Sequence, residues 1–294
     1  MTDYRAEVIA DSVGPNGVRL TTMVVTFPRF ILPELNTHRV FSRNSASTRA
    51  IPLRRQVAAV SEHMAMPLVW TRARSGMQGG ALIEGTERRA LDGLWIAAGR
   101  AVVRFVGVLA DFGSHKQHGG RLLEPWRWHT VVITATEWDG FFAQRCHEDA
   151  QPEMRHIAEM MREARRRSLP RVLKPLQAHL PFVSEAEAEE LGAGGAIKVS
   201  VARCARVSYL THDGRRDVSK DFELFHRLVS HRPMHASPLE HVALAMPERA
   251  GDMLSDRGRC RVAADIYVTP DTDTENFWCG NFRGWLQYRK LMGE

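Results

Sequence analysis

The chain has 294 residues, 44% of them hydrophobic and 25% charged, with a formal net charge of +6 and a pI near 9.4. This length and apolar content can bury one large core or two smaller ones. The basic surface favours anionic partners, nucleotides and nucleic acid among them, without discriminating between them. No apolar run approaches the length of a membrane span, and residues 1–12 lack the apolar region of a signal peptide, so we expect no membrane segment.

The cysteines are scattered along the chain, and no two of them form a C-x-x-C pair. This spacing argues against a disulfide framework and against a zinc site. We therefore expect reduced thiols in a cytoplasmic protein without a bound metal. The cysteines are Cys146, Cys204, Cys260 and Cys279.

Strand and helix patterns alternate along the sequence. Residues 4–10 and 18–27 are predicted as strands, because the second is rich in β-branched residues and a Gly14-Pro15-Asn16-Gly17 turn separates the two. Pro28 ends the second strand, and a short helix is expected after it. Further helices are predicted at 52–63, 86–112, 137–146, 150–168 and 184–191, with a strand at 129–136.

The longest helical pattern covers residues 86–112. Its apolar residues recur at three-and-four spacing, so we expect a core helix in which Trp95 and Phe105 pack rather than stack on a ligand. Residues 162–174 are strongly basic. They are interpreted first as the solvated end of a helix, where cations suit the helix dipole, and second as a contact for the phosphates of a nucleic acid.

Residues 36–49 are the most informative stretch. From Asn36 to Arg49 they contain one histidine, three arginines and three serines, directly after an apolar strand-like run. Burying so many polar groups costs a few kcal/mol for each one left unpaired. The stretch is therefore either a solvated loop or a set of donors that converge on an anionic, hydrogen-bonding ligand.

A second run extends over residues 137–155. Glu137, Phe141 and Arg145 recur every four residues and share one helix face. From these residues alone, the run is either a helical ion pair beside a core phenylalanine or part of a binding site. Cys146 follows Arg145 directly and is interpreted as incidental.

A third run comprises residues 202–209 and 231–241. Three histidines within eleven residues suggest a metal, but Pro233 and Pro238 break the helical register and no suitable third ligand accompanies an i, i+4 pair. A structural role, with Ser237 as a cap, is the other interpretation. No G-x-G-x-x-G follows a predicted strand and no G-x-x-x-x-G-K-[ST] occurs, so the two commonest dinucleotide and NTP folds are absent.

Together the three runs resemble the flavin-dependent thymidylate synthases. That family's Arg-His-Arg signature, followed by Asn, Ser and Arg, is matched by His38, Arg39, Asn44, Ser47 and Arg49. Its second nucleotide-binding segment is matched by Phe141, Arg145 and Ala150-Gln151-Pro152-Glu153. Its Arg-Val-Ser-Phe and His-x-Ser-Pro-x-Glu-His elements are matched by Arg206-Val207-Ser208-Tyr209 and by His235 to His241.

The chain departs from the family in segment order and at several residues. The third run follows the signature here, whereas family members place it before, which indicates a phage-type, circularly permuted member. Thr37, Ser45, Thr134 and Thr136 replace charged or amide groups, and Glu34 stands where the family often has Gln.

The resemblance implies an α+β fold, with a small antiparallel sheet packed with several long helices. One domain would cover 1–294, with the signature and second segment in 1–178 and the permuted flavin-binding segment in 195–294. FAD would be the cofactor, methylenetetrahydrofolate and NADPH the co-substrates, and deoxyuridylate the substrate converted to thymidylate. The assembly would be a homotetramer that combines residues of several subunits in each site.

The resemblance also assigns roles to single residues. The expected catalytic residues are Arg145, beside the pyrimidine O2/N3 edge, and Ser47, in the phosphate cradle. The expected substrate-binding residues are Glu34, Ser45, Ser47, Arg49 and Arg145. The expected flavin-binding residues are His38, Arg39, Asn44, Ser208, His235 and Ser237.

Two other functions stay open. Because a carboxylate accepts from the exocyclic amine of cytosine, Glu34 favours a methyl- or hydroxymethyltransferase acting on cytosine, as dCMP or in DNA. The basic run and the positive charge fit a DNA partner, and a base within a duplex would need flipping. The third function is a non-catalytic nucleic-acid-binding protein without flavin, which would bind DNA in a strongly salt-dependent way.

Overall fold

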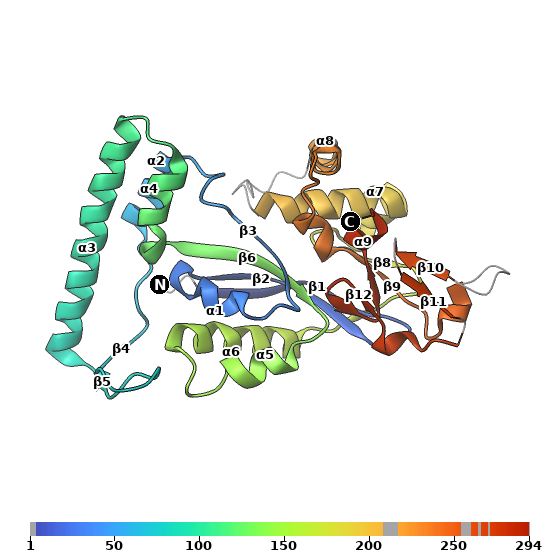
Figure 1. Cartoon of the computed structure of the whole chain (residues 1–294), viewed down its shortest axis with the longest axis horizontal. Coiled ribbons are helices and arrows are strands. Elements are labelled where there is room, and N and C mark those ends of the chain that lie inside the picture. Colours follow the sequence, from blue (N-terminus) through green and yellow to red (C-terminus); the bar gives the residue numbers. More distant parts are fainter. Residues whose placement is uncertain (1–3, 208–216, 254–259, 264–265, 270, 294) are drawn as a thin grey trace.

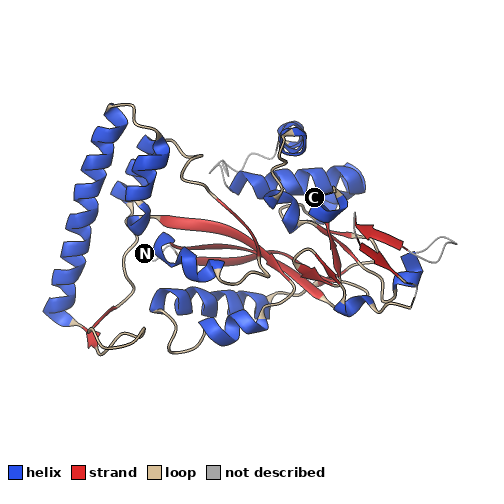
Figure 2. Cartoon of the chain, in the orientation of Figure 1, coloured by secondary structure: helices blue, strands red, loops and turns tan. Residues whose placement is uncertain are grey.

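The computed structural model of the chain describes residues 4–207, 217–253, 260–263, 266–269 and 271–293. Helices and strands mix in an elongated molecule, with the longest strands at its centre (Figure 1). Helices cover both faces of this central sheet, and a further group stands at one end (Figure 2). The fold class is therefore α+β, as predicted, whereas the division at 178 and 195 stays a prediction.

Five strands form the central sheet in the order β3-β6-β2-β1-β7. All neighbours are antiparallel except β1 and β7, so the sheet is mixed at one edge rather than wholly antiparallel as expected. The turn Gly14–Gly17 joins β1 to β2, and Gly17 has the positive φ of 76° that such a turn requires. The strands are β1 (Arg5–Val13), β2 (Arg19–Pro28), β3 (Ser42–Ser45), β6 (Trp128–Ala135) and β7 (Arg171–Val172).

One face of this sheet packs on helices to form the main core. Alternate residues of β2 and β6 point to this face, because side chains along a strand alternate between the two sides of a sheet. Large side chains from α5 and α6 pack against this face of the sheet. Trp138, which directly precedes α5, is part of the same core and is 1% exposed. The helices of this layer are α1 (Leu32–Asn36), α5 (Asp139–Arg145) and α6 (Pro152–Arg167).

The C-terminal part of the chain packs beside the other face. Trp285 inserts next to Val18 and Leu20 of the first hairpin, and its indole Nε1 donates to the Val18 carbonyl at 3.1 Å. The helices here are α7 (Glu185–Arg206), α8 (Val218–Ser230), the 3-10 helix η4 (Ser237–His241) and α9 (Tyr288–Leu291). A second sheet has the order β14-β9-β8, with β8 (Ala178–His179), β9 (Ala243–Ala245) and β14 (Trp285–Gln287).

Short elements complete the described part of the chain. The small hairpins pair β4 (Trp70–Thr71) with β5 (Leu82–Ile83), β10 (Cys260–Ala263) with β11 (Ile266–Val268), and β12 (Trp278–Cys279) with β13 (Phe282–Arg283). The remaining helices are η1 (Arg29–Ile31), α2 (Leu53–Glu62), α3 (Gly85–Asp111), α4 (Lys116–Leu122), η2 (Glu124–Trp126), η5 (Ala250–Met253) and η6 (Thr274–Asn276).

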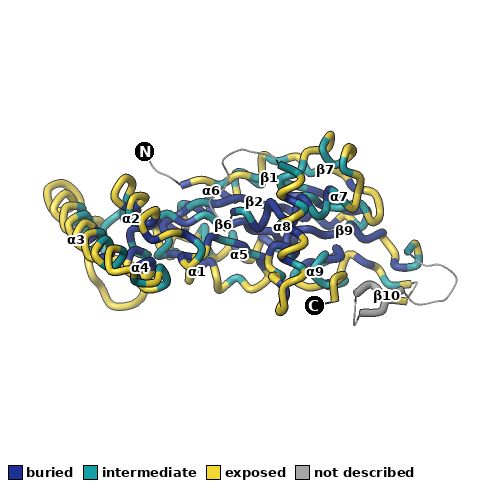
Figure 3. The backbone as a smooth tube through the Cα atoms, turned by 90° about the horizontal axis from the view of Figure 1, so that it is seen from above, coloured by how far each residue is buried: buried dark blue, intermediate teal, exposed yellow. Residues whose placement is uncertain are grey.

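Helix α3 matches the predicted helix to within one residue at each end but is not a core helix. It stands at one end of the molecule and is mostly exposed along its length (Figure 3). Trp95 packs as expected, donating its indole N–H to the Ala65 carbonyl, whereas Phe105 is 68% exposed. The expectation of no membrane-length apolar run is also wrong, since α3 contains an 18-residue window with a mean hydropathy of 1.5. One such helix is weak evidence for a membrane segment.

The acidic helix predicted at 184–191 is the first part of a longer one. Ser184 caps it, accepting a hydrogen bond from the Glu187 backbone N–H at 3.3 Å. The chain kinks at Gly192, where φ is 66°, and continues as α7 to Arg206. An exposed acidic turn and a buried apolar helix thus share one element.

A buried chain of hydrogen bonds crosses the molecule from β1 to η4. The ring nitrogens of His179 contact the hydroxyls of Ser12 and Thr22, each at 2.8 Å. The Thr22 hydroxyl lies 2.8 Å from that of Thr134, which in turn lies 2.8 Å from Nδ1 of His241. Burial lowers the pKa of both histidines to about 3, so both rings are neutral at pH 7.

Because both histidines are neutral in the folded state, we predict that the free energy of unfolding decreases in acid. An unfolded histidine has a pKa near 6.5, so as the pH falls below that value the unfolded chain binds protons before the folded chain does. The free energy of unfolding should decrease until about pH 3, with a loss of about 2 kcal/mol per buried histidine between pH 7 and pH 5. Urea denaturation at the two pH values checks this for the wild type and for His179→Gln.

The His179→Gln variant should lose about 2 kcal/mol less than the wild type over this pH interval. The exposed His118→Gln serves as the matched control. If the His179→Gln variant and the wild type lose the same free energy of unfolding, the pKa of His179 does not differ between the folded and unfolded states.

Candidate functional site

The three sequence runs meet at helix α1 and at the edge strand β3. Strand β3 follows α1 closely and pairs with β6, with Asn44 opposite Val132. Its alternate side chains point to opposite faces, so Arg43 reaches α1 whereas Ser42 and Asn44 reach the C-terminal part. Contacts from both faces of the sheet therefore converge on the four residues of β3 (Ser42–Ser45).

Arg145 connects the second run to the first. Its Nε donates to Nε2 of His38 at 2.9 Å, and its Nη2 donates to the Thr37 hydroxyl at 2.8 Å and to the Glu34 carbonyl at 3.3 Å. Helix α5 carries Arg145 at its last residue, where it faces the end of α1. The predicted residues Glu34, His38 and Arg145 are thus brought together, although more than 100 positions separate Arg145 from the others.

His38 is held in its neutral form. Burial, together with the nearby guanidinium groups of Arg145 and Arg43, lowers its pKa to about 4. The neutral ring accepts at Nε2 and so carries its proton on Nδ1. Packing against Phe141, with ring centroids 4.9 Å apart, fixes the orientation of the imidazole.

Arg43 joins this group to the third run, a role that sequence reasoning missed. Its Nη1 donates to the carbonyls of Leu35 and His38, at 3.1 and 3.3 Å. Burial lowers its pKa, and the carboxylate of Glu240 in η4 opposes that change. Because its guanidinium caps the end of α1, Arg43 fixes the helix that carries Glu34.

Asn44 and Ser237 meet on the other face of β3. The Asn44 side chain is 8% exposed and donates to the Cys204 carbonyl of α7 at 2.7 Å. The Ser237 hydroxyl donates to the Asn44 side-chain oxygen at 3.5 Å. Their predicted proximity is thus observed, whereas flavin binding by either residue stays a prediction, and the Asn44 amide is engaged within the protein.

The C-terminal tail also contacts the signature strand. Asn281 and Gln287 both donate to the Ser42 hydroxyl, at 3.2 and 3.0 Å. Arg289 forms an ion pair with Glu240. The tail consists mainly of β12, β13 and β14, followed by the four helical residues of α9. No motif marks these residues in the sequence.

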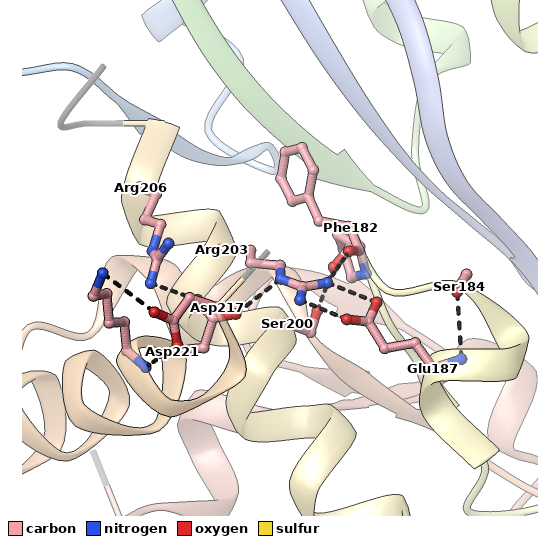
Figure 4. Close-up of polar contacts among 10 residues, drawn as sticks. Phe182, Ser184, Glu187, Ser200, Arg203, Arg206, Asp217 and Asp221 are labelled. Atoms are coloured by element: carbon pink, nitrogen blue, oxygen red, sulfur yellow. Dashed lines mark hydrogen bonds and ion pairs between the residues drawn. The ribbon is translucent and has the colours of Figure 1, made fainter. Parts of the chain in front are cut away.

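A buried ion network holds α7 against α8 (Figure 4). Arg203 contacts Asp221 at 3.0 Å and Glu187 at 2.5 Å, and it donates to the Phe182 carbonyl at 2.8 Å. Arg206, from the third run, lies 2.8 Å from the same Asp221. Removing one partner of such a network strands a buried charge, so the network fixes the helix whose Cys204 carbonyl meets Asn44.

Several predicted residues lie apart from this cluster. Arg39, Ser47 and Arg49 are exposed on the surface near β3, and Ser45 is half-buried on the strand. His235 is exposed and lies next to His231, with ring centroids 4.7 Å apart. Ser208 lies outside the described residues. Within the described residues, no group of three or more His, Cys, Asp or Glu side chains could hold a metal ion.

Thr134 and Thr136, which replace family residues, are structural. Thr134 is fully buried in the hydrogen-bond chain to His241, and Thr136 accepts from the Arg283 backbone N–H at 3.1 Å. The Thr134 side chain is therefore engaged within the sheet and that of Thr136 with the tail, rather than with a ligand. Glu153, in the last matched motif, is also internal, accepting the Leu68 backbone N–H at 2.7 Å.

Three of the six cations in the basic run 162–174 form ion pairs within the fold. Glu163 pairs with both Arg166 and Arg167, and Arg171 pairs with Glu185. Burial lowers the pKa of Arg165, which lies beside Arg19. These contacts favour a solvated helix end, and DNA binding by this run stays a prediction.

The donor set fits a phosphate-bearing flavin. Arg39 and Arg49 are exposed, and no hydrogen bond or ion pair of either guanidinium is found in the described parts of the chain. Such groups suit the phosphates of a dinucleotide or nucleotide. The neutral His38 ring adds an N–H donor that a flavin carbonyl could accept.

Comparisons with known proteins give distant likenesses in structure. No protein-family model and no curated protein matches the sequence. The UMP/dUMP methylase PolB from Streptomyces cacaoi bound with 5-Br UMP matches with a TM-score of 0.45 and 16% identity, over 56% of this chain and 89% of that one. Thymidylate Synthase X (ThyX) from Helicobacter pylori, with FAD and dUMP, matches with 0.37 and 13%, over 50% of this chain and 67% of that one. These scores, all below 0.5, assign no function to this chain.

The Asn44 amide is predicted to be a structural link. Asn44→Ala should lower the free energy of unfolding by about 1–3 kcal/mol, because the Cys204 carbonyl loses its buried donor. Urea denaturation of this variant, with the exposed Ser47→Ala as a control expected within about 0.5 kcal/mol of wild type, provides the measurement. Unchanged stability of Asn44→Ala would contradict this structural role.

Proposed function

We propose that this chain is an enzyme that transfers a one-carbon group to C5 of a pyrimidine nucleotide. FAD would be its cofactor, and methylenetetrahydrofolate and NADPH its co-substrates. The proposal is carried by one observation: three sequence runs, each resembling a different segment of one enzyme family, meet at α1 and β3 through Arg145, Arg43 and Asn44. By that resemblance, the substrate is deoxyuridylate and the product thymidylate.

The reaction forms a carbon–carbon bond at C5 and breaks a carbon–hydrogen bond. The methylene carbon leaves the folate for C5, and the C5 proton leaves to solvent. Reducing methylene to methyl takes two electrons from NADPH, and tetrahydrofolate is released. The bound flavin would supply the redox chemistry that carries those electrons.

Arg145 is positioned to stabilise the charge that develops on the pyrimidine. Negative charge grows at the O2/N3 edge as C5 becomes nucleophilic, and a preorganised guanidinium stabilises it. Its Nε and Nη2 are held by His38, Thr37 and the Glu34 carbonyl, while no hydrogen bond of Nη1 is found among the described residues. Nη1 is therefore the atom we assign to the base.

Ser47 and Arg49 would bind the nucleotide phosphate from their exposed loop. Their exposure fits the predicted homotetramer, in which another copy would complete each site. The convergence of the runs at α1 and β3 also supports the proposed circular permutation, because the fold unites segments whose order along the chain differs from the family's.

The first test is the absorbance spectrum of the purified protein after incubation with FAD, followed by an assay of tritium release. We expect flavin absorbance and release of tritium from a C5-labelled pyrimidine nucleotide that depends on both methylenetetrahydrofolate and NADPH. Labelled dUMP and dCMP are assayed side by side. A protein that binds no flavin and releases no tritium from either nucleotide would contradict the proposed function.

Arg145→Ala is expected to lower kcat by about 100-fold or more, about 3 kcal/mol of transition-state stabilisation. Arg155→Ala removes an exposed arginine that pairs with Glu159 on α6 and serves as the matched control, expected to keep wild-type turnover. Steady-state kinetics on both variants measure the effect. Wild-type turnover in Arg145→Ala would exclude its assigned role.

A further inference from the structure

The turn at residues 47–51 carries Ser47 and Arg49, the two residues assigned to the nucleotide phosphate. Both are exposed, whereas Thr48 between them is 2% exposed. The Ala50 N–H donates to the Ser47 carbonyl at 2.9 Å, and the Arg49 N–H donates to the Ser47 hydroxyl at 3.3 Å. These bonds close the turn on itself, so its attachment to the rest of the fold depends on other contacts.

A buried glutamine attaches this turn to α2. Gln56 lies in the first turn of that helix and is 1% exposed. Its Nε2 donates to the Thr48 carbonyl at 2.9 Å and to the Ile51 carbonyl at 2.8 Å, which uses both protons of the amide. The Thr48 carbonyl belongs to the peptide unit that joins Thr48 to Arg49. The amide therefore holds the backbone from which the Arg49 side chain projects.

Arg127 fixes the orientation of the Gln56 amide. Its Nη1 donates to Gln56 Oε1 at 3.1 Å, and Arg127 is 7% exposed at the position directly before β6. A guanidinium can only donate and a backbone carbonyl can only accept, so the amide oxygen must face Arg127 and the amide nitrogen must face the turn. Two buried side chains thus connect the exposed turn to the central sheet.

Helix α4 packs directly on the same amide (Figure 1). A Cβ atom at Gly120 would lie 2.8 Å from Gln56 Oε1 and 3.2 Å from the Thr48 Cβ. Glycine allows this close approach of the α4 backbone, whereas any side chain at position 120 would displace the amide or the turn. Gln56 is therefore enclosed on all the sides that determine its position.

We propose that Gln56 is a positioning residue that holds the turn 47–51 in the geometry that binds a nucleotide phosphate. The inference rests on the proposed function and adds the residue that preorganises its phosphate site. A phosphate binds most tightly to donors that are already in place, because ordering them on binding costs free energy. Gln56 acts on the phosphate end of the nucleotide and not on the base.

The Gln56→Glu variant separates this role from a general effect on folding. Its carboxylate can still accept from Arg127, now as an ion pair, but it cannot donate to the carbonyls of Thr48 and Ile51. The measurement is isothermal titration calorimetry of the full chain loaded with FAD, with dUMP and with deoxyuridine, which lacks the phosphate.

Wild type should bind dUMP at least about tenfold more tightly than deoxyuridine. Gln56→Glu should reduce this ratio to about threefold or less, and its affinity for deoxyuridine should equal that of wild type. A loss confined to the phosphate-bearing ligand is the result that a general structural defect would not produce.

Gly120→Ala is a second variant, which displaces Gln56 without changing its chemistry and should reduce the same ratio. Gly93→Ala on α3, where a Cβ atom meets open space, is its matched control. Gln177→Glu is the control for the glutamine change, because the Gln177 Oε1 accepts from the Lys174 N–H and a carboxylate retains that contact. Both controls should keep the wild-type ratio, and thermal denaturation confirms that each variant is folded.

An unchanged ratio in Gln56→Glu and Gly120→Ala would overturn the role of Gln56 and leave the proposed function intact. Equal binding of dUMP and deoxyuridine by wild type would also overturn it, because the turn would then bind no phosphate. If wild type binds neither ligand, both the proposed function and the inference are overturned. If Gln56→Glu does not fold, the ratio in Gly120→Ala decides.

Discussion

The pairing of β3 with β6 is the constraint on which the candidate site depends. This edge strand has only four residues, but its backbone ladder fixes which side chains face each side of the sheet. Arg43 consequently reaches the carbonyls of α1, while Ser42 and Asn44 reach the tail and α7. A slip of one residue in the register would exchange these faces and break the contacts of the first run with the third.

The charges of the site are arranged around groups that stay neutral or unpaired. Burial keeps His38 neutral, so its ring can accept from Arg145 rather than repel it. The guanidinium is held by three partners without being neutralised by a carboxylate, which preserves its charge for a ligand. The same arrangement leaves the Glu34 Oε2 atom without a donor. Both features cost stability in the free protein.

The rest of the fold stabilises this edge from a distance. The hydrogen-bond chain through Thr134 anchors η4 on the sheet, and the Arg203 network anchors α7. Trp285 ties the tail to the first hairpin. By contrast, α3 extends away from these contacts, and neither its exposed apolar face nor its length contributes to the site.

The sequence alone determined the local elements and the residue types of the site. Periodicity located β2, α2, α3 and α6 because alternation and three-and-four spacing depend only on neighbours along the chain. The same pattern could not show that Phe105 faces solvent, since a pattern identifies an apolar face but not its partner. The contact of Arg145 with His38, the burial of Arg43 and the orphaned Glu34 oxygen were decided by the tertiary structure alone. They arise from packing between segments far apart in the sequence, and no local propensity encodes such distances.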